Sequence, residues 1–171
     1  GRPVCCELWS GNHADGNALL PVVDRLRQRF GLTRVCWVAD RGMLSQDTIQ
    51  GLEARGLEYI LGARMRRQRE VAQSVLGRAG RYQEVAENLW VKEVWVEGRR
   101  YVVCLNPDEA AKDAEERKAI VKALEDELKQ GARQLVGNRG YRRFLQVDKD
   151  AVTIDTKKVA TEARYDGKFL I

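Results

Sequence analysis

The sequence predicts an α/β fold in which a mixed β/α insertion interrupts a layer of strands and helices. The first observation is an unbroken apolar run, residues 35–39, which ends in Asp40 and predicts a strand buried on both faces. The second is that strand-like and helix-like segments alternate over residues 1–65, as in right-handed parallel crossovers. The third is a change of pattern after residue 65, where hairpin-like strands and one long charged helix follow.

Residues 4–9 predict the first strand of this layer, and a loop rich in glycine and asparagine follows them. Apolar residues at helical spacing then predict a helix that Gly31 ends. Asp15 or Asn17 can cap this helix, and Pro21 favours the later start, because proline is tolerated in the first turn and not deeper. The apolar stripe consists of Leu19, Val22, Val23, Leu26 and Phe30.

The strand that ends at Asp40 is followed by a second helix and a further strand. Ser45 is the expected N-cap of this helix and Gly56 its end. Residues 57–62 then predict a strand. Residues 1–69 therefore form part of an α/β core, and Asp40 lies at a strand end, where open α/β sheets place their ligands.

Residues 70–165 predict the insertion. Two strands, 90–96 and 99–105, flank a two-residue turn and predict an antiparallel hairpin. Asn106 and Pro107 then begin a helix that runs to about residue 130. Its single apolar stripe and dense charge predict an amphipathic surface helix, and a coiled-coil partner is the lesser alternative. Residues 151–154 predict a short strand, and residues 166–171 a turn and a strand that returns to the core.

Composition restricts the class of protein. The chain has 171 residues with a net charge of +5, and no apolar run approaches the roughly 18–20 residues that span a bilayer. A cytoplasmic protein with reduced cysteines is expected. The basic excess permits a nucleic-acid partner, because the planar guanidinium of arginine suits phosphate. The arginines expected to contact DNA gather beside Asp40 and after the 57–62 strand: Arg41, Arg64, Arg66, Arg67 and Arg69.

Asp40 is the candidate catalytic and metal-binding residue. Its carboxylate is a suitable ligand for Mg²⁺, and two such ions clamp the attacking and leaving oxygens of phosphoryl transfer. A site of that kind needs at least two more carboxylates. The alternative is that Asp40 only caps the loop that follows it or pairs with Arg41. The chain has no glycine-rich phosphate loop and no nucleophile elbow, which disfavours a dinucleotide fold and serine hydrolase chemistry.

The segment Val38-Ala39-Asp40-Arg41-Gly42-Met43 resembles the second-aspartate motif of bacterial insertion-sequence transposases of the DDE type. The likeness extends over nearly the whole chain, in the same order as in such enzymes. It includes Gly11-Asn12 with Asp15 before the motif, residues 29–32 and 57–62 around it, and residues 166–169 after the insertion.

This resemblance implies a ribonuclease-H-like fold with three acidic residues that bind two divalent ions, Mg²⁺ or Mn²⁺. It implies DNA as the partner, both the element ends and the target, and allows a homodimer of the full-length protein. Only Asp40 matches a catalytic position; neither Glu7 nor Asp166 has the context of the other two, and Tyr141-Arg142-Arg143 is not the usual tyrosine-arginine-glutamate-lysine signature. The chain is therefore expected to be a central fragment, inactive alone.

Two other hypotheses remain open at this stage. One is a non-catalytic DNA-binding or oligomerisation remnant in which Asp40 is vestigial. The other is an α/β domain that binds a small molecule, with Asp40 as a polar contact; the missing glycine-rich loop argues against it. The flanking residues would distinguish a non-catalytic remnant from an active transposase. An active enzyme needs an upstream aspartate on a strand and a downstream glutamate on a helix.

Overall fold

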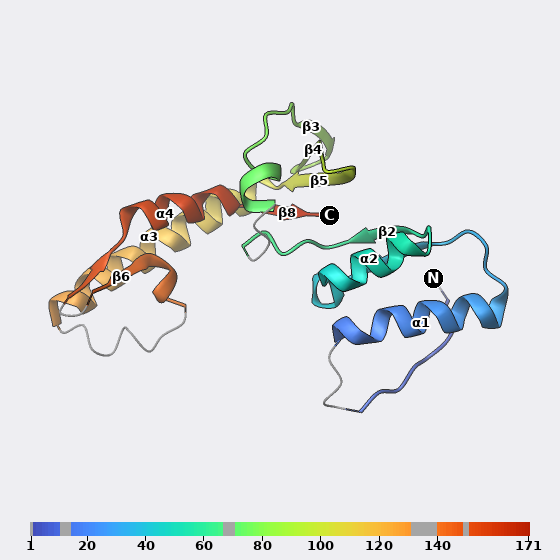
Figure 1. The fold of residues 1–171 in the computed structure, drawn as a ribbon. Helices are drawn as coiled ribbons and strands as arrows, with labels where there is room; N and C mark the ends of the chain where they lie inside the picture. Colours follow the sequence, from blue (N-terminus) through green and yellow to red (C-terminus); the bar gives the residue numbers. More distant parts are fainter. Residues whose placement is uncertain (1, 11–14, 67–70, 131–139, 149–150) are drawn as a thin grey trace. The chain divides into compact units, whose positions relative to one another are not determined.

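The computed structural model describes residues 2–10, 15–66, 71–130, 140–148 and 151–171, and its chain divides into two units (Figure 1). Unit 1 comprises residues 1–71 with Ile171, and unit 2 comprises residues 72–170. Each unit combines helices with a sheet, which confirms the predicted α/β class. Among the described residues, no helix has the length and apolar character needed to cross a membrane.

Unit 1 is a parallel β-α-β arrangement with one helix before it. Strands β1 and β2 pair in parallel, with Val38 opposite Ile60, and α2 is their crossover, as predicted. The core lies on one face of this sheet, where Trp37 and Leu61 meet Val23 of α1 and Leu52 of α2. The elements are α1 (Asp15–Phe30), β1 (Cys36–Ala39), the 3₁₀ helix η1 (Arg41–Met43), α2 (Gln46–Ala54) and β2 (Glu58–Leu61).

The predicted helix boundaries of α2 are confirmed by its cap contacts. The Ser45 hydroxyl accepts a hydrogen bond from the Thr48 backbone N–H at 3.0 Å, which satisfies one of the unpaired donors of the first turn. Gly56 follows the helix with φ +63°, and Gly31 follows α1 with φ +60°. Both glycines adopt the left-handed conformation that commonly ends a helix.

Three expectations for unit 1 are wrong. Residues 4–9 form no strand, since no described backbone hydrogen bond pairs them with another strand, and Leu8 is 96% exposed. β1 is not buried on both faces, because α1 and α2 pack on the same face and leave Val38 73% exposed on the other. α1 begins at Asp15, so Pro21 lies beyond its first turn, where it removes one backbone hydrogen bond.

Unit 2 contains a four-stranded antiparallel sheet with the order β3-β4-β5-β8. The predicted hairpin is confirmed, and its turn residues Glu97 and Gly98 both have positive φ, 49° and 79°, as a type I′ turn requires. The strand expected after residue 166 is β8, and its hydrogen-bonded neighbour is β5. The bounds are β3 (Gln83–Ala86), β4 (Leu89–Val96), β5 (Arg99–Leu105) and β8 (Lys168–Leu170).

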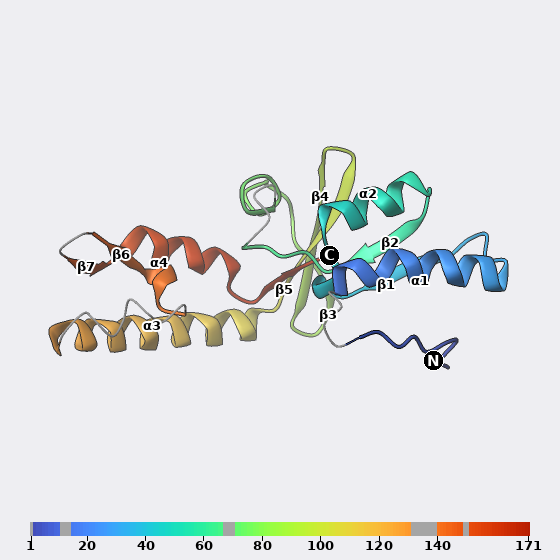
Figure 2. The same ribbon diagram turned by 60° about the horizontal axis from the view of Figure 1, so that its bottom comes forward.

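A second core in unit 2 is built on the long helix α3. Asn106 caps it by accepting from the Glu109 N–H at 3.0 Å, as predicted. The α4 helix and the β6–β7 hairpin lie along α3 (Figure 2), and Leu124 packs there with Phe144 and Leu145. The apolar stripe of α3 is thus partnered within the unit. The elements are α3 (Pro107–Gln130), β6 (Leu145–Val147), β7 (Val152–Ile154) and α4 (Thr156–Glu162), with short helices η2 (Val71–Val75), η4 (Arg142–Phe144) and η5 (Ala163–Tyr165).

All four cysteines are free thiols, and Cys104 on β5 is buried. Burial raises the pKa of the Cys104 thiol above its ordinary value of 9.0. The unfolded chain therefore loses this proton at a lower pH than the folded chain. The stability contributed by the neutral thiol is complete below pH 9 and is lost as the pH rises toward the folded-state pKa.

Cys104→Ala should lower the free energy of unfolding by about 1 kcal/mol at neutral pH, because it removes a buried sulfur. This difference from the unchanged chain should shrink as the pH rises above 9, which urea unfolding at several pH values would measure. Cys6→Ala, at an exposed position, is the control and should show no such trend. A Cys104→Ala difference that stays constant with pH would contradict the expectation.

Candidate active site

The carboxyl ends of β1 and β2 lie at the same edge of the parallel pair, as they do in any parallel sheet. Asp40 follows β1 directly, and Gly62 follows β2. The Gly62 N–H donates to the Ala39 carbonyl at 3.3 Å, which extends the pairing by one residue. Asp40 therefore lies at the edge where the sequence places it, beside the segment that leaves β2.

The Asp40 side chain is exposed and caps the 3₁₀ helix η1. Its Oδ1 accepts a hydrogen bond from the Arg41 N–H at 2.7 Å, and its carbonyl accepts from the Met43 N–H at 3.0 Å. The capping role considered for Asp40 is thus present. An ionised carboxylate has about four acceptor positions, so this one hydrogen bond leaves capacity for a cation.

The donor set fits one position of a Mg²⁺ or Mn²⁺ site and does not complete it. Mg²⁺ takes oxygen ligands, commonly one or two carboxylates with waters and substrate phosphates. Among the residues that the structure describes, no group of three or more histidine, cysteine, aspartate or glutamate side chains is close enough to hold a metal ion. Asp40 therefore fits as a single ligand of such an ion.

Glu7 and Asp166, the other acidic residues weighed from the sequence, are each engaged in an ion pair. Glu7 pairs with Arg25 of α1. Asp166 pairs with Arg117 of α3, and both side chains are largely buried, with exposed fractions of 14% and 15%. Asp166 thus holds the turn before β8 against α3, a structural role within unit 2.

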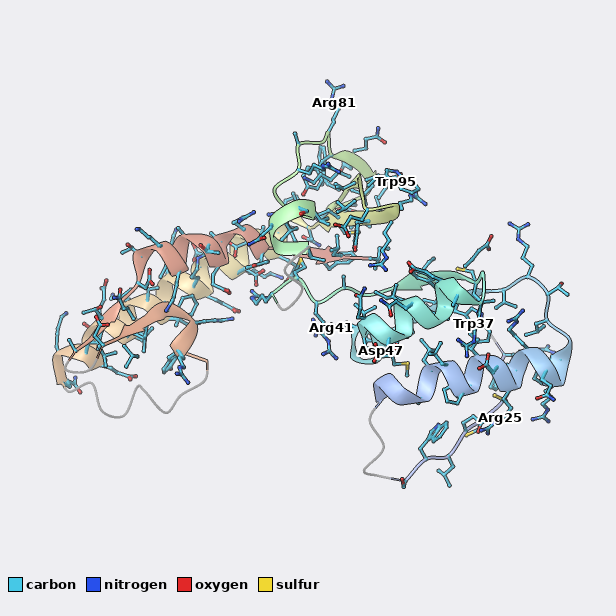
Figure 3. All side chains as sticks on the ribbon, in the orientation of Figure 1. Arg25, Trp37, Arg41, Asp47, Arg81 and Trp95 are labelled. Carbon is cyan, nitrogen blue, oxygen red and sulfur yellow. The ribbon has the colours of Figure 1, made fainter. Side chains whose placement is uncertain are left out.

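The arginines expected to contact DNA have different surroundings. Arg41 is exposed, and its side chain extends away from the ribbon (Figure 3). Arg64 is half-buried and donates to two main-chain carbonyls, through Nε to Arg41 at 2.9 Å and through a terminal nitrogen to Gly42 at 3.1 Å. Arg66 is exposed. Arg67 and Arg69 lie outside the described residues, as does the Gly11-Asn12 part of the resemblance.

Sequence reasoning missed the role of Gly62. A Cβ at this position would lie 3.2 Å from the Arg41 backbone nitrogen, the atom that donates to Asp40. A side chain there would press on the peptide that holds the carboxylate. The only sequence signal is a glycine directly after a strand, which indicates close backbone approach but does not name the partner.

Comparison with known proteins gives one assignment. The family model described as transposase DDE domain matches residues 1–150, which is most of the chain and includes β1, Asp40 and β2. No curated protein and no solved structure matches. Because the family model covers far more than half of the sequence, the chain belongs to the transposase DDE domain family.

Proposed function

We propose that this chain supplies Asp40 as one of three metal-binding carboxylates in a DNA transposase that hydrolyses phosphodiester bonds and transfers strands. The observation that carries the proposal is an exposed aspartate at the carboxyl edge of a parallel strand pair, in a chain of the transposase DDE domain family. Family membership supports transposase function and the general use of divalent metal. The finer assignment to Asp40 rests on its position and on its resemblance to the second-aspartate motif.

Residues 1–69 are proposed as part of a ribonuclease-H-like catalytic core, and residues 70–165 as an insertion that precedes β8. When bound, Mg²⁺ or Mn²⁺ would stabilise charge on the attacking and leaving oxygens. Asp40 holds a negatively charged oxygen at the strand end, in a direction that the Arg41 N–H restrains. Because one carboxylate does not hold two ions, the chain alone is expected not to cleave DNA.

The DNA partners in this proposal are the element ends and the target, in the cytoplasm. The arginines after β2 contribute the phosphate contacts: each guanidinium that neutralises a phosphate releases a counterion, which makes binding weaken with salt. Arg66, Arg67 and Arg69 follow one another closely at the end of unit 1. Their positive charges attract the phosphates of the DNA backbone whatever the base sequence.

Replacing Arg66, Arg67 and Arg69 together by alanine should weaken DNA binding by the isolated chain. The slope of log K against log salt concentration should fall by about 0.9 for each phosphate of duplex DNA that the variant no longer neutralises. Titration of a labelled duplex at several salt concentrations measures both quantities. The matched control removes three exposed positive charges from unit 2, at Lys118, Lys122 and Lys157. Equal affinity and slope in the arginine variant and the unchanged chain would refute the assignment.

A further inference from the structure

We propose that Arg64 is a positioning residue for Asp40: it holds the 3₁₀ turn whose backbone directs the carboxylate. This inference rests on the proposed function of Asp40 and gives Arg64 a role other than the phosphate contact expected from the sequence. Its basis is the set of hydrogen bonds between the segment after β2 and the peptides of residues 40–42.

The first step concerns the direction of the Asp40 carboxylate. Its described restraint is the bond from the Arg41 N–H to Oδ1, at 2.7 Å. An N–H donor can restrain the carboxylate only if its own peptide plane is fixed, because a hydrogen bond weakens steeply as its angle closes. The orientation of the peptide between Asp40 and Arg41 therefore sets the orientation of the side chain.

The second step is that η1 has little internal support. It is a three-residue 3₁₀ helix, closed by Met43 N–H to the Asp40 carbonyl at 3.0 Å and by Leu44 N–H to the Arg41 carbonyl at 3.4 Å. The 3₁₀ geometry gives poorer hydrogen bonds than the α-helix, and the second of these contacts is long. The turn thus depends on contacts from elsewhere.

Arg64 supplies two such contacts at once, through two donors. Its Nε lies 2.9 Å from the Arg41 carbonyl oxygen, and a terminal nitrogen lies 3.1 Å from the Gly42 carbonyl oxygen. The rigid guanidinium fork fixes these two successive carbonyls relative to each other. It does so from a half-buried position, and hydrogen bonds from a charged donor are stronger than neutral ones.

Gly62 allows the segment after β2 to lie close to the backbone of residues 39–41. Its N–H donates to the Ala39 carbonyl at 3.3 Å, and the position of a Cβ would be 3.2 Å from the Arg41 nitrogen. The chain leaving β2 thus contacts the Asp40–Arg41 peptide at Gly62 and the next two carbonyls at Arg64. The direction of Asp40 is fixed by the chain that follows β2.

The test measures the side-chain rotamer of Asp40 in the isolated, isotope-labelled chain by NMR. Three-bond couplings from the Asp40 Cγ to its backbone N and C′ report whether χ1 occupies one rotamer or several. In the unchanged chain they should indicate one rotamer. In Arg64→Ala and Arg64→Lys they should move roughly halfway or more toward rotamer-averaged values, because lysine keeps the charge but loses the fork. Gly62→Ala should move them in the same direction without altering any charge.

Two references separate positioning from general loss of structure. The couplings of Asp47, an exposed carboxylate in the first turn of α2, should stay unchanged in all variants. Arg34→Ala removes an equal charge that pairs with Glu58 at the other end of β2, and should leave Asp40 in one rotamer. Arg64→Lys couplings equal to those of the unchanged chain would overturn the proposal. Because neither DNA nor metal takes part, this failure is distinct from a failure of the proposed function.

Discussion

Asp40→Asn is expected to slow metal-dependent DNA cleavage roughly a hundredfold to a thousandfold in a chain that also carries the two further carboxylates. Asparagine keeps the size of the side chain and an oxygen that can accept from the Arg41 N–H, so η1 should form as before. What is lost is the negative charge that holds a hard cation, and electrostatic stabilisation of this kind is commonly worth roughly a hundredfold to a thousandfold per group. The rate of nicking of a labelled duplex bearing the element ends, in Mg²⁺, is the measurement.

Asp47→Asn is the matched control. Asp47 is an exposed carboxylate of the same unit, at the start of α2 (Figure 3), and its removal costs only a favourable helix-dipole interaction of about 0.5 kcal/mol. Nicking should change less than about twofold. The chain without the other two carboxylates should show no cleavage in Mg²⁺ or Mn²⁺. Cleavage by that chain, abolished by Asp40→Ala, would contradict the claim that its site is incomplete.

Gly167→Ala is expected to lower the free energy of unfolding of unit 2 by at least about 3 kcal/mol. Gly167 has φ +58°, and a Cβ would lie 2.3 Å from the Asn106 carbonyl oxygen and 2.5 Å from the Ala110 nitrogen. Both are backbone atoms at the start of α3, so neither can move away from the added methyl group unless the helix moves with it. The turn is also held by the Gly167 N–H donating to the Asp113 carboxylate at 2.8 Å, so the clash would disturb that bond as well.

Gly98→Ala separates the clash from the backbone conformation. Gly98 also has positive φ, +79°, but a Cβ there would have no atom within 4 Å. Its replacement should therefore cost only the left-handed conformation of alanine, about 1–2 kcal/mol. Urea unfolding followed by tryptophan fluorescence would compare the two variants. Equal losses would show that α3 yields to the added methyl group and that the Gly167 contact is not tight.

Local chemistry made part of this fold predictable. The Glu97-Gly98 turn, the Ser45 cap and the Asn106 cap each depend on residues within a few positions of one another, so the sequence contains the whole signal. The run before Asp40 was correctly predicted as a strand for the same reason, and parallel pairing with β2 followed from the helix between them.

The predictions that failed depend on partners distant in the sequence. Residues 4–9 have the composition of a strand, but a strand also needs a neighbour, and composition does not supply one. The prediction that β1 is buried on both faces was wrong because α1 and α2 cover the same face of the sheet. An apolar run alone does not indicate which faces the helices cover. Helix α4 is an exception: it was missed although its cap is local, since Asp155 accepts hydrogen bonds from the Lys157 and Lys158 N–H groups.

The candidate site shows the same division. Asp40 could be selected because a carboxylate at the end of an apolar strand is visible in one short segment. The contacts of Gly62 and Arg64 with residues 39–42 could not be predicted from the sequence, because they arise only when the segment after β2 meets the segment after β1. A basic cluster is also ambiguous in sequence, since a guanidinium donates equally well to phosphate and to a main-chain carbonyl.

The most direct measurement of the central claim, that Asp40 binds the metal ion, is the metal preference of Asp40→Cys in a chain with all three carboxylates. A thiolate is a poor ligand for Mg²⁺, whereas Mn²⁺ accepts sulfur more readily. DNA cleavage by Asp40→Cys should be lost in Mg²⁺ and measurably restored in Mn²⁺, while Asp40→Ala stays inactive in both. Activity of Asp40→Cys that is retained equally in Mg²⁺ and Mn²⁺ would contradict direct coordination by residue 40.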